Sequence, residues 1–129
     1  MTLTNVGKAV IAHAITGDIG TGKTYNAFDV THAYLGVGDG TTAFSATQTN
    51  LQAATNKLRK LVDAAPTFST ATINFVATFT TAEANYAWQE DGIFNAVTAG
   101  EMLTRNLQYL IVKTSAVSVV FTKTLTISV

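Results

Sequence analysis

The sequence predicts a mainly β fold: an antiparallel β-sandwich or barrel with one N-terminal helix, forming a single domain over residues 1–129. Threonine supplies 23 of the 129 residues, and this β-branched polar side chain suits the exposed face of a strand. The second half of the chain alternates apolar and polar residues with the period of two that strands require. Charged residues make up only 12% of the chain, about half the usual share, which indicates a largely uncharged surface.

The helix candidate lies at the start of the chain. Thr4 or Asn5 can cap its N-terminus, and Gly17 stands where a C-terminal glycine stop is expected. Its apolar stripe follows helical spacing through Val6, Ala9, Val10 and Ala14. Residues 17–26 are polar and rich in glycine, so they predict a loop.

The middle of the chain is less regular. Residues 30–37 predict a strand that ends in the turn Gly38-Asp39-Gly40, whose Asp-Gly pair tolerates positive φ. Residues 41–50 are rich in Thr, Ser and Gln and are expected to be exposed. Residues 51–63 fit either a helix or a strand, because Leu51, Ala54 and Leu58 keep helical spacing, whereas Leu58 and Val62 could also enter a strand.

The second half predicts four strands. They cover the alternating segment around residues 72–79, then residues 86–94, 102–112 and 117–129, with a turn at 98–100 before the third. The last segment has the clearest pattern: its apolar residues occupy odd positions, which predicts one buried face centred on Phe121. Lys123 is the exception on that face.

The net charge and the absence of cysteine argue against several classes of function. The formal net charge is zero, so the chain has no net positive charge to attract a polyanion. We therefore expect no nucleic-acid partner. Cysteine is absent, which excludes thiolate catalysis and zinc sites built on cysteine. The apolar run at residues 9–15 is too short to cross a bilayer, so no membrane partner is expected. A chain with so little charge tends to associate, and we therefore expect a homo-oligomer.

One segment matches a catalytic motif. Residues 17–24 fit G-x-x-x-x-G-K-[ST], the phosphate-binding loop of nucleotide hydrolases, in which Lys23 and Thr24 would contact phosphate and Mg²⁺. Such a loop follows a buried strand and opens a helix, whereas here a helical stripe precedes it and none follows. We favour an exposed glycine loop, and a P-loop nucleotide-binding protein remains the weaker alternative.

Other polar residues offer less. His13 and His32 are too few for a metal site without carboxylate ligands, and we assign neither of them a ligand or catalytic role. Glu83, Glu90 and Asp91 suit a cation site or an acid/base pair, but the run Glu90-Asp91-Gly92 is also typical of a turn, which we favour. We therefore predict no catalytic residue, no metal and no cofactor.

The candidate partner contacts are a basic cluster and a row of threonines. Lys57, Arg59 and Lys60 form the basic cluster, which is either a solvated edge or a dock for an acidic protein partner. Thr122 and Thr124 lie on the polar face of the last predicted strand, which is the alternative binding surface.

Several segments resemble small virion structural proteins of tailed bacteriophages. The resemblance extends over most of the chain and is carried by a GxGxxT-like turn, a T-x-L segment and a GIFNA strand, within residues 3–8, 33–44, 47–51, 85–90, 92–96 and 100–105. The order of these segments is also similar to that in the tail-collar and fibre-attachment domains of phages. Asp91 departs from the pattern, because an apolar residue is expected before Gly92.

The resemblance implies a β-rich subunit of the virion that is not an enzyme and acts by binding other virion proteins. We expect a capsid decoration protein, in a trimer on the major capsid protein, that stabilises the assembled head. A tail, collar or fibre-attachment protein is the alternative. The chain lacks coiled-coil heptads and fibre repeats, which favours decoration. Localisation would be the virion, after synthesis in the host cytoplasm.

Overall fold

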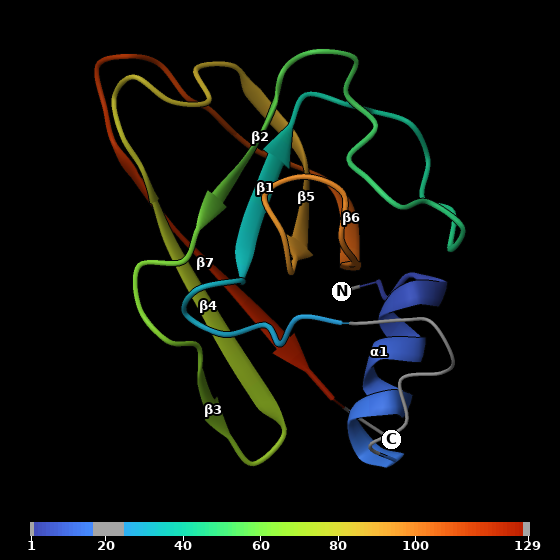
Figure 1. The fold of residues 1–129 in the computed structure, drawn as a ribbon. Helices are drawn as coiled ribbons and strands as arrows, with labels where there is room; N and C mark the ends of the chain where they lie inside the picture. The colour runs from blue at the N-terminus through green and yellow to red at the C-terminus, as the bar shows by residue number, and fades with distance from the viewer. Residues whose placement is uncertain (1, 17–24, 128–129) are drawn as a thin grey trace.

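The computed structural model describes residues 2–16 and 25–127, which form one helix and two antiparallel sheets (Figure 1). The predicted mainly β class is confirmed, and the sheets form a sandwich-like pair rather than a closed barrel. The elements are α1 (Asn5–Thr16), β1 (Tyr34–Gly38), β2 (Lys57–Leu61), β3 (Thr67–Ser69), β4 (Thr72–Phe79), β5 (Ala87–Phe94), β6 (Met102–Val112) and β7 (Val119–Thr126).

The two sheets differ in size and enclose a shared core. Sheet A has the strand order β2-β1-β5-β6, and sheet B has the order β3-β4-β7. Figure 1 shows β4 and β7 as the two long strands that run beside sheet A. Apolar side chains from both sheets form the main core, which consists of Ala33, Leu35, Val37, Val62, Phe75, Ala77, Phe79, Ala84, Trp88, Ile93, Leu103 and Leu125. We call the face of each sheet turned away from this core its outer face.

Helix α1 begins as predicted. The Thr4 side-chain oxygen accepts the Gly7 N–H at 2.9 Å, so Thr4 is the N-cap. A Cβ on Gly7 would lie 2.1 Å from the Leu103 carbonyl oxygen, so glycine lets the helix approach β6 closely. The predicted stop at Gly17 and the P-loop match over residues 17–24 lie outside the described residues. Residues 25–33, directly after that match, contain no helix.

The N-terminal residues cover half of the β6 edge. The Thr4 N–H donates to the Leu103 carbonyl at 3.2 Å, and the Arg105 N–H donates to the Thr2 carbonyl at 3.1 Å. Within the described ranges, the second half of β6 pairs only with β5, so its outer edge is free there. This free half carries exposed apolar side chains: Leu107, Tyr109, Ile111 and Val112.

Strand β1 is shorter at its start than predicted. Asp29 opens a turn, because its carboxylate accepts the Thr31 N–H at 3.0 Å and the His32 N–H at 3.0 Å. Hydrogen bonds from the Thr31 and His32 side chains hold the pKa of the Asp29 carboxyl at about 2. The strand therefore starts only at Tyr34.

The predicted turn at residues 38–40 is wrong in its geometry. The strand does end at Gly38, but the only glycine with positive φ in the described part of the chain is Gly100. The chain instead continues as a long segment over residues 39–56, which we call the covering loop, and returns as β2 beside β1. The ambiguous segment is thus a strand at its C-terminal end, and residues 41–50 are largely exposed, as expected.

The remaining strands agree closely with the sequence pattern. The bounds of β6 match the prediction, β5 starts one residue late, and β4 covers the alternating segment. Ala99 and Gly100 have positive φ in the predicted turn before β6. In β7 the predicted register is confirmed, because odd residues face inward, but the strand covers only Val119–Thr126 of the predicted 117–129. Its predicted buried face is also smaller than expected: Leu125 alone is fully buried, Val119 and Phe121 are half-buried, and Val117 and Ile127 are exposed.

Candidate binding site

Two acidic residues that the sequence assigned to a turn lie in the middle of β5, so that prediction is wrong. Glu90 and Asp91 are both fully buried. A turn was favoured because Asp-Gly pairs are typical of turns, but here Gly92 serves close packing instead. A Cβ on Gly92 would lie 2.9 Å from Phe94 Cε2 and from the Thr104 carbonyl oxygen.

Glu90 anchors the covering loop on the outer face of sheet A. Its carboxylate accepts the Arg105 Nε–H at 2.7 Å and the backbone N–H groups of Gln52 and Ala53 at 2.9 and 2.8 Å. Arg105 is also fully buried and donates to the Thr42 carbonyl at 2.9 Å. The buried charges are therefore paired and hydrogen-bonded, which compensates the cost of removing them from water.

Asp91 faces the other way and joins the two sheets. Its carboxylate lies 2.9 Å from Lys123 Nζ on β7 and accepts the Asn106 amide N–H at 3.2 Å. This pair explains both anomalies of the sequence: the acidic residue before Gly92 and the lysine on the inward face of β7. The earlier grouping of Glu83, Glu90 and Asp91 does not hold, because Glu83 pairs instead with Lys60. No cluster of potential metal ligands occurs within residues 2–16 and 25–127.

The structure divides the predicted basic cluster between two faces of β2. Lys60 lies opposite Leu35, and its Nζ lies 2.7 Å from a Glu83 carboxylate oxygen. That hydrogen bond is the main reason why the pKa of Glu83 is lowered. Lys57 and Arg59 lie opposite Gly38 and Gly36, on the outer face of sheet A.

Arg59 is held rigidly at the rim of a pocket. Its guanidinium carbon lies 3.6 Å from the centre of the Phe94 ring, a cation–π geometry. Nη1 donates to the Ala96 and Ala99 carbonyls at 2.9 and 2.8 Å, and Nη2 donates to Asn50 Oδ1 at 3.0 Å. Partial burial lowers the pKa of the guanidinium, which nevertheless remains a cation.

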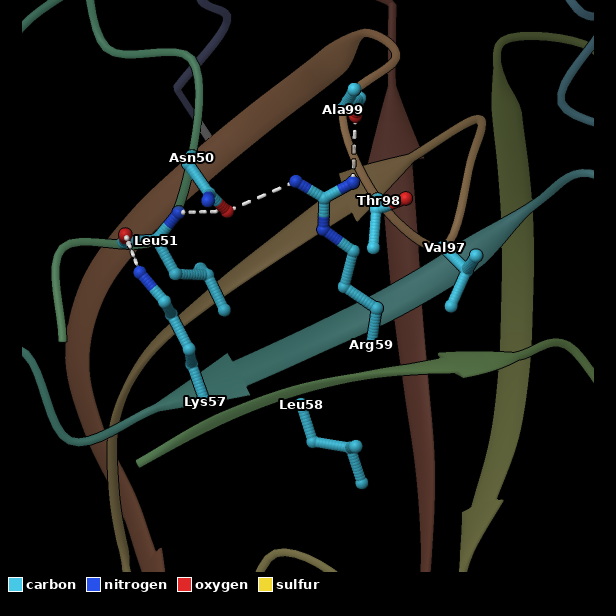
Figure 2. Close-up of a pocket in the computed structure, with 8 residues that line it drawn as sticks. All are labelled: Asn50, Leu51, Lys57, Leu58, Arg59, Val97, Thr98 and Ala99. Carbon is cyan, nitrogen blue, oxygen red and sulfur yellow. Dashed lines mark hydrogen bonds between the residues drawn. The ribbon is translucent and has the colours of Figure 1, made fainter. Parts of the chain in front are cut away.

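The pocket is open and has a volume of about 340 Å³ (Figure 2). Figure 2 shows Lys57 and Leu51 on one side of the Arg59 guanidinium and the loop that carries Thr98 on the other. Lys57 Nζ makes one long hydrogen bond, 3.4 Å, to the Leu51 carbonyl. The lining residues are Asn50, Leu51, Lys57, Leu58, Arg59, Val97, Thr98 and Ala99. The sequence predicts the two cations but not the pocket, because one of its walls, residues 97–99, comes from a segment far along the chain from residues 50–59.

The predicted threonine contacts lie on the opposite side of the molecule. Thr122 and Thr124 are exposed on the outer face of sheet B, and the Thr124 hydroxyl donates to Asn74 Oδ1 on β4 at 2.6 Å. Apart from Lys60, the predicted contact residues therefore form two separate surfaces, a basic pocket on sheet A and a threonine face on sheet B.

The two histidines have local partners. His32 Nδ1 lies 2.8 Å from Asp29 Oδ1 at an exposed position. The His13 ring stacks on Tyr25, with the ring centres 5.5 Å apart. Neither histidine lies in the Lys57–Arg59 pocket.

Comparison with protein-family models, with curated proteins and with solved structures finds no match to this chain. Within the described residues, no helix has the length and apolar character needed to span a membrane. The functional argument therefore rests on the fold and on the geometry of these surfaces.

Proposed function

We propose that this chain is a structural protein of a tailed-phage virion that binds the assembled head as a decoration protein. The virion context comes from the resemblance carried by segments such as residues 33–44 and 92–96. The observation that carries a binding role is the free half of β6, an unprotected strand edge with exposed apolar side chains. Tyr109 is 63% exposed and Val112 is 55% exposed. Exposed apolar surface beside a free strand edge is typical of protein–protein contact.

The outer face of sheet B supports the same role. Val120 is 65% exposed beside the threonine row of β7, and Phe68 on β3 is 85% exposed. None of the side chains on the outward face of β7 carries a charge, so desolvating this face on a large partner would cost little. The proposed partner is the major capsid protein.

The proposed mechanism is mass action. A subunit that binds the assembled head and not its dissociated proteins stabilises the head by RT ln(1 + [L]/Kd) at each site. Added over many sites, this stabilisation free energy would help the head to resist the outward pressure of packaged DNA. A subunit that is itself rigid loses little conformational entropy on binding, and the buried Glu90–Arg105 and Asp91–Lys123 pairs restrain the covering loop and the two sheets.

We further propose that the subunits form a trimer on the head. A three-fold ring needs two different surfaces that meet head to tail. In the described part of the chain, β2, β6 and β7 lie at sheet edges, so the free half of β6 has other edges with which to pair.

Reconstitution tests the proposed function. Phage particles stripped of accessory proteins would be incubated with the purified chain and imaged by electron microscopy. We expect added density on the head and a higher temperature of DNA release. Density confined to the tail or its collar would overturn decoration in favour of the tail alternative. Absence of binding to both head and tail would contradict the virion role itself.

A further inference from the structure

The pocket on β2 contains cations that no carboxylate neutralises. Within residues 2–16 and 25–127, the ion pairs of acidic residues involve His32, Lys60, Arg105 and Lys123, whereas Lys57 and Arg59 have no carboxylate within 4 Å. Arg59 is half-buried, so its charge has lost part of its hydration. A partly desolvated cation without a counter-ion is costly, and an incoming anion would relieve that cost.

The Arg59 guanidinium is also prepared for such an anion. Three of its N–H groups are used by the Ala96 and Ala99 carbonyls and by Asn50. A guanidinium has five N–H groups, so the Nε–H and one Nη2–H have no acceptor within the described residues. Figure 2 shows the Asn50 oxygen at the edge between Nε and Nη2, so the remaining Nη2–H points away from that edge, and only the Nε–H is directed to the side of Leu51 and Lys57. The Nε–H and the Lys57 ammonium can each donate a hydrogen bond to an anion on that side.

The walls of the pocket indicate which kind of anion fits. Val97, which is 56% exposed, contributes apolar surface beside the cations, and Asn50 and Thr98 contribute neutral polar groups. A phosphate group would leave strongly hydrated oxygens against the apolar walls. The net charge of zero also gives no long-range attraction for a nucleic acid. A carboxylate side chain next to an apolar residue satisfies both parts of the lining.

We propose that this pocket binds an aspartate or glutamate side chain of the partner protein, with an apolar neighbour of that residue packed against Val97. The carboxylate would accept the Arg59 Nε–H and a hydrogen bond from the Lys57 ammonium. The inference rests on the proposed function only for the source of the carboxylate, a protein of the virion.

Peptide titration tests the chemistry of the pocket without any virion component. The blocked tripeptide Ac-Leu-Glu-Leu-NH₂ would be titrated into ¹⁵N-labelled protein, with Ac-Leu-Gln-Leu-NH₂ as the neutral isostere and inorganic phosphate as the competing anion. We expect saturable shifts of the Leu51, Leu58 and Ala99 amide signals with the glutamate peptide, and binding roughly tenfold weaker with the glutamine peptide. Equal binding of the two peptides, or tighter binding of phosphate, would overturn the proposal.

Two substitutions and one control locate the binding. Lys57→Gln removes an exposed charge with little structural role, and we expect it to weaken glutamate-peptide binding several-fold. Lys8→Gln makes the same change on α1 and should leave binding unchanged. Arg59→Lys keeps the charge but loses the Nε–H and the planar guanidinium that stacks on Phe94, so it should weaken binding more than Lys57→Gln. If Arg59→Lys fails to fold, the difference in glutamate-peptide binding between Lys57→Gln and Lys8→Gln still tests whether the pocket is the binding site.

Binding to stripped heads separates this inference from the proposed function. If wild-type protein binds heads and Lys57→Gln binds them less tightly, the pocket contacts the capsid protein. If both bind heads equally, the proposed function stands and the pocket assignment fails. If wild-type protein binds the glutamate peptide but neither head nor tail, the carboxylate site stands and the virion role fails.

Discussion

Buried charges link distant parts of this chain at the scale of single residues. Lys123 and Asp91 come from different sheets and meet inside the sandwich, where Asp91 is fully buried and the Lys123 side chain is 13% exposed. Glu90, on the neighbouring position of β5, points to the covering loop instead. Adjacent residues of one strand thus hold together three layers: the loop, sheet A and sheet B.

Removing Lys123 should destabilise the fold strongly. In Lys123→Met, the buried Asp91 carboxylate keeps only the Asn106 amide as a partner, and we expect a loss of about 3–5 kcal/mol in the free energy of unfolding. Urea denaturation measures this loss. Thr122→Ala, one residue away on the exposed face, is the control and should cost less than about 0.5 kcal/mol. Equal stability of Lys123→Met and wild type would show that the pair does not hold the sheets together.

Tyr86 should make stability sensitive to high pH. Its hydroxyl donates to the Val37 carbonyl at 3.1 Å, and burial, followed by the negative charges of Asp39 and Glu90, raises its pKa well above 10. In the unfolded chain the phenol ionises near pH 10, whereas in the fold it stays neutral, so its contribution is complete below about pH 10 and is lost as the pH rises further.

The variant Tyr86→Phe tests this dependence. It should cost about 1 kcal/mol near pH 7, because one hydrogen bond is lost. Between about pH 9 and about pH 11, its denaturation midpoint should fall less than that of the wild type. A parallel decline of both proteins would exclude Tyr86 as the titrating group.

At the scale of secondary-structure elements, two glycines allow close packing on the outer face of sheet A. On the outer face of sheet A, Gly36 and Gly92 lie opposite each other on β1 and β5, and the Phe94 ring lies over both. The missing Cβ atoms provide the space in which this ring and the covering loop pack closely. Arg59 then stacks on the ring, so the glycines also position the candidate pocket.

A methyl group at Gly36 should disturb this packing. A Cβ there would lie 2.6 Å from Phe94 Cε2 and 3.1 Å from Leu51 Cδ1, so we expect Gly36→Ala to cost about 1–3 kcal/mol. Phe94→Leu removes the clashing ring atoms, and the double variant should therefore be more stable than the sum of the two single losses predicts. Strictly additive losses, measured by thermal or urea denaturation, would mean that the ring and the glycine do not compete for space.

In the part of the molecule that the structure describes, one half of β6 is protected and the other half is free. Residues 2–4 hydrogen-bond to the first half, but the second half exposes its edge together with Leu107 and Tyr109. Natural sheets usually protect such edges with lysine, proline or a covering segment. The sequence Leu107-Gln108-Tyr109-Leu110-Ile111-Val112 has no charge and no proline, so we expect this edge to pair in the assembled state.

A charge on this edge should block self-association. Tyr109→Lys places an ammonium group at a 63% exposed position, so the fold should be preserved while the oligomer weakens. Sedimentation at rising concentration, and cross-linking on reconstituted heads, would compare this variant with wild type. Ile15→Lys, at an 81% exposed position on α1, is the matched control. If Tyr109→Lys associates as well as wild type does, the contact lies elsewhere.

Local periodicity was enough to predict the fold class, the helix cap and most strands. The alternation in β4, β6 and β7 depends only on the backbone, which turns successive side chains to opposite faces. The segment around Glu90 was misread because a charged run with glycine is ordinarily solvated. The lysine at an inward position of β7 was the one sequence signal of a buried acidic partner, but it could not identify Asp91.

Sequence alone determined a threonine-rich, nearly uncharged antiparallel β protein, because composition and alternation are properties of neighbouring residues. Only the tertiary structure decided that Lys57 and Arg59 share a pocket while Lys60 faces another way, since β1 fixes which side of β2 each residue occupies. It also decided the roles of Arg105, which donates to the Thr42 carbonyl 63 residues away, and of Phe94, on whose ring Arg59 stacks. Such contacts arise when sheet pairing closes long loops, and no local pattern records which distant segments will meet.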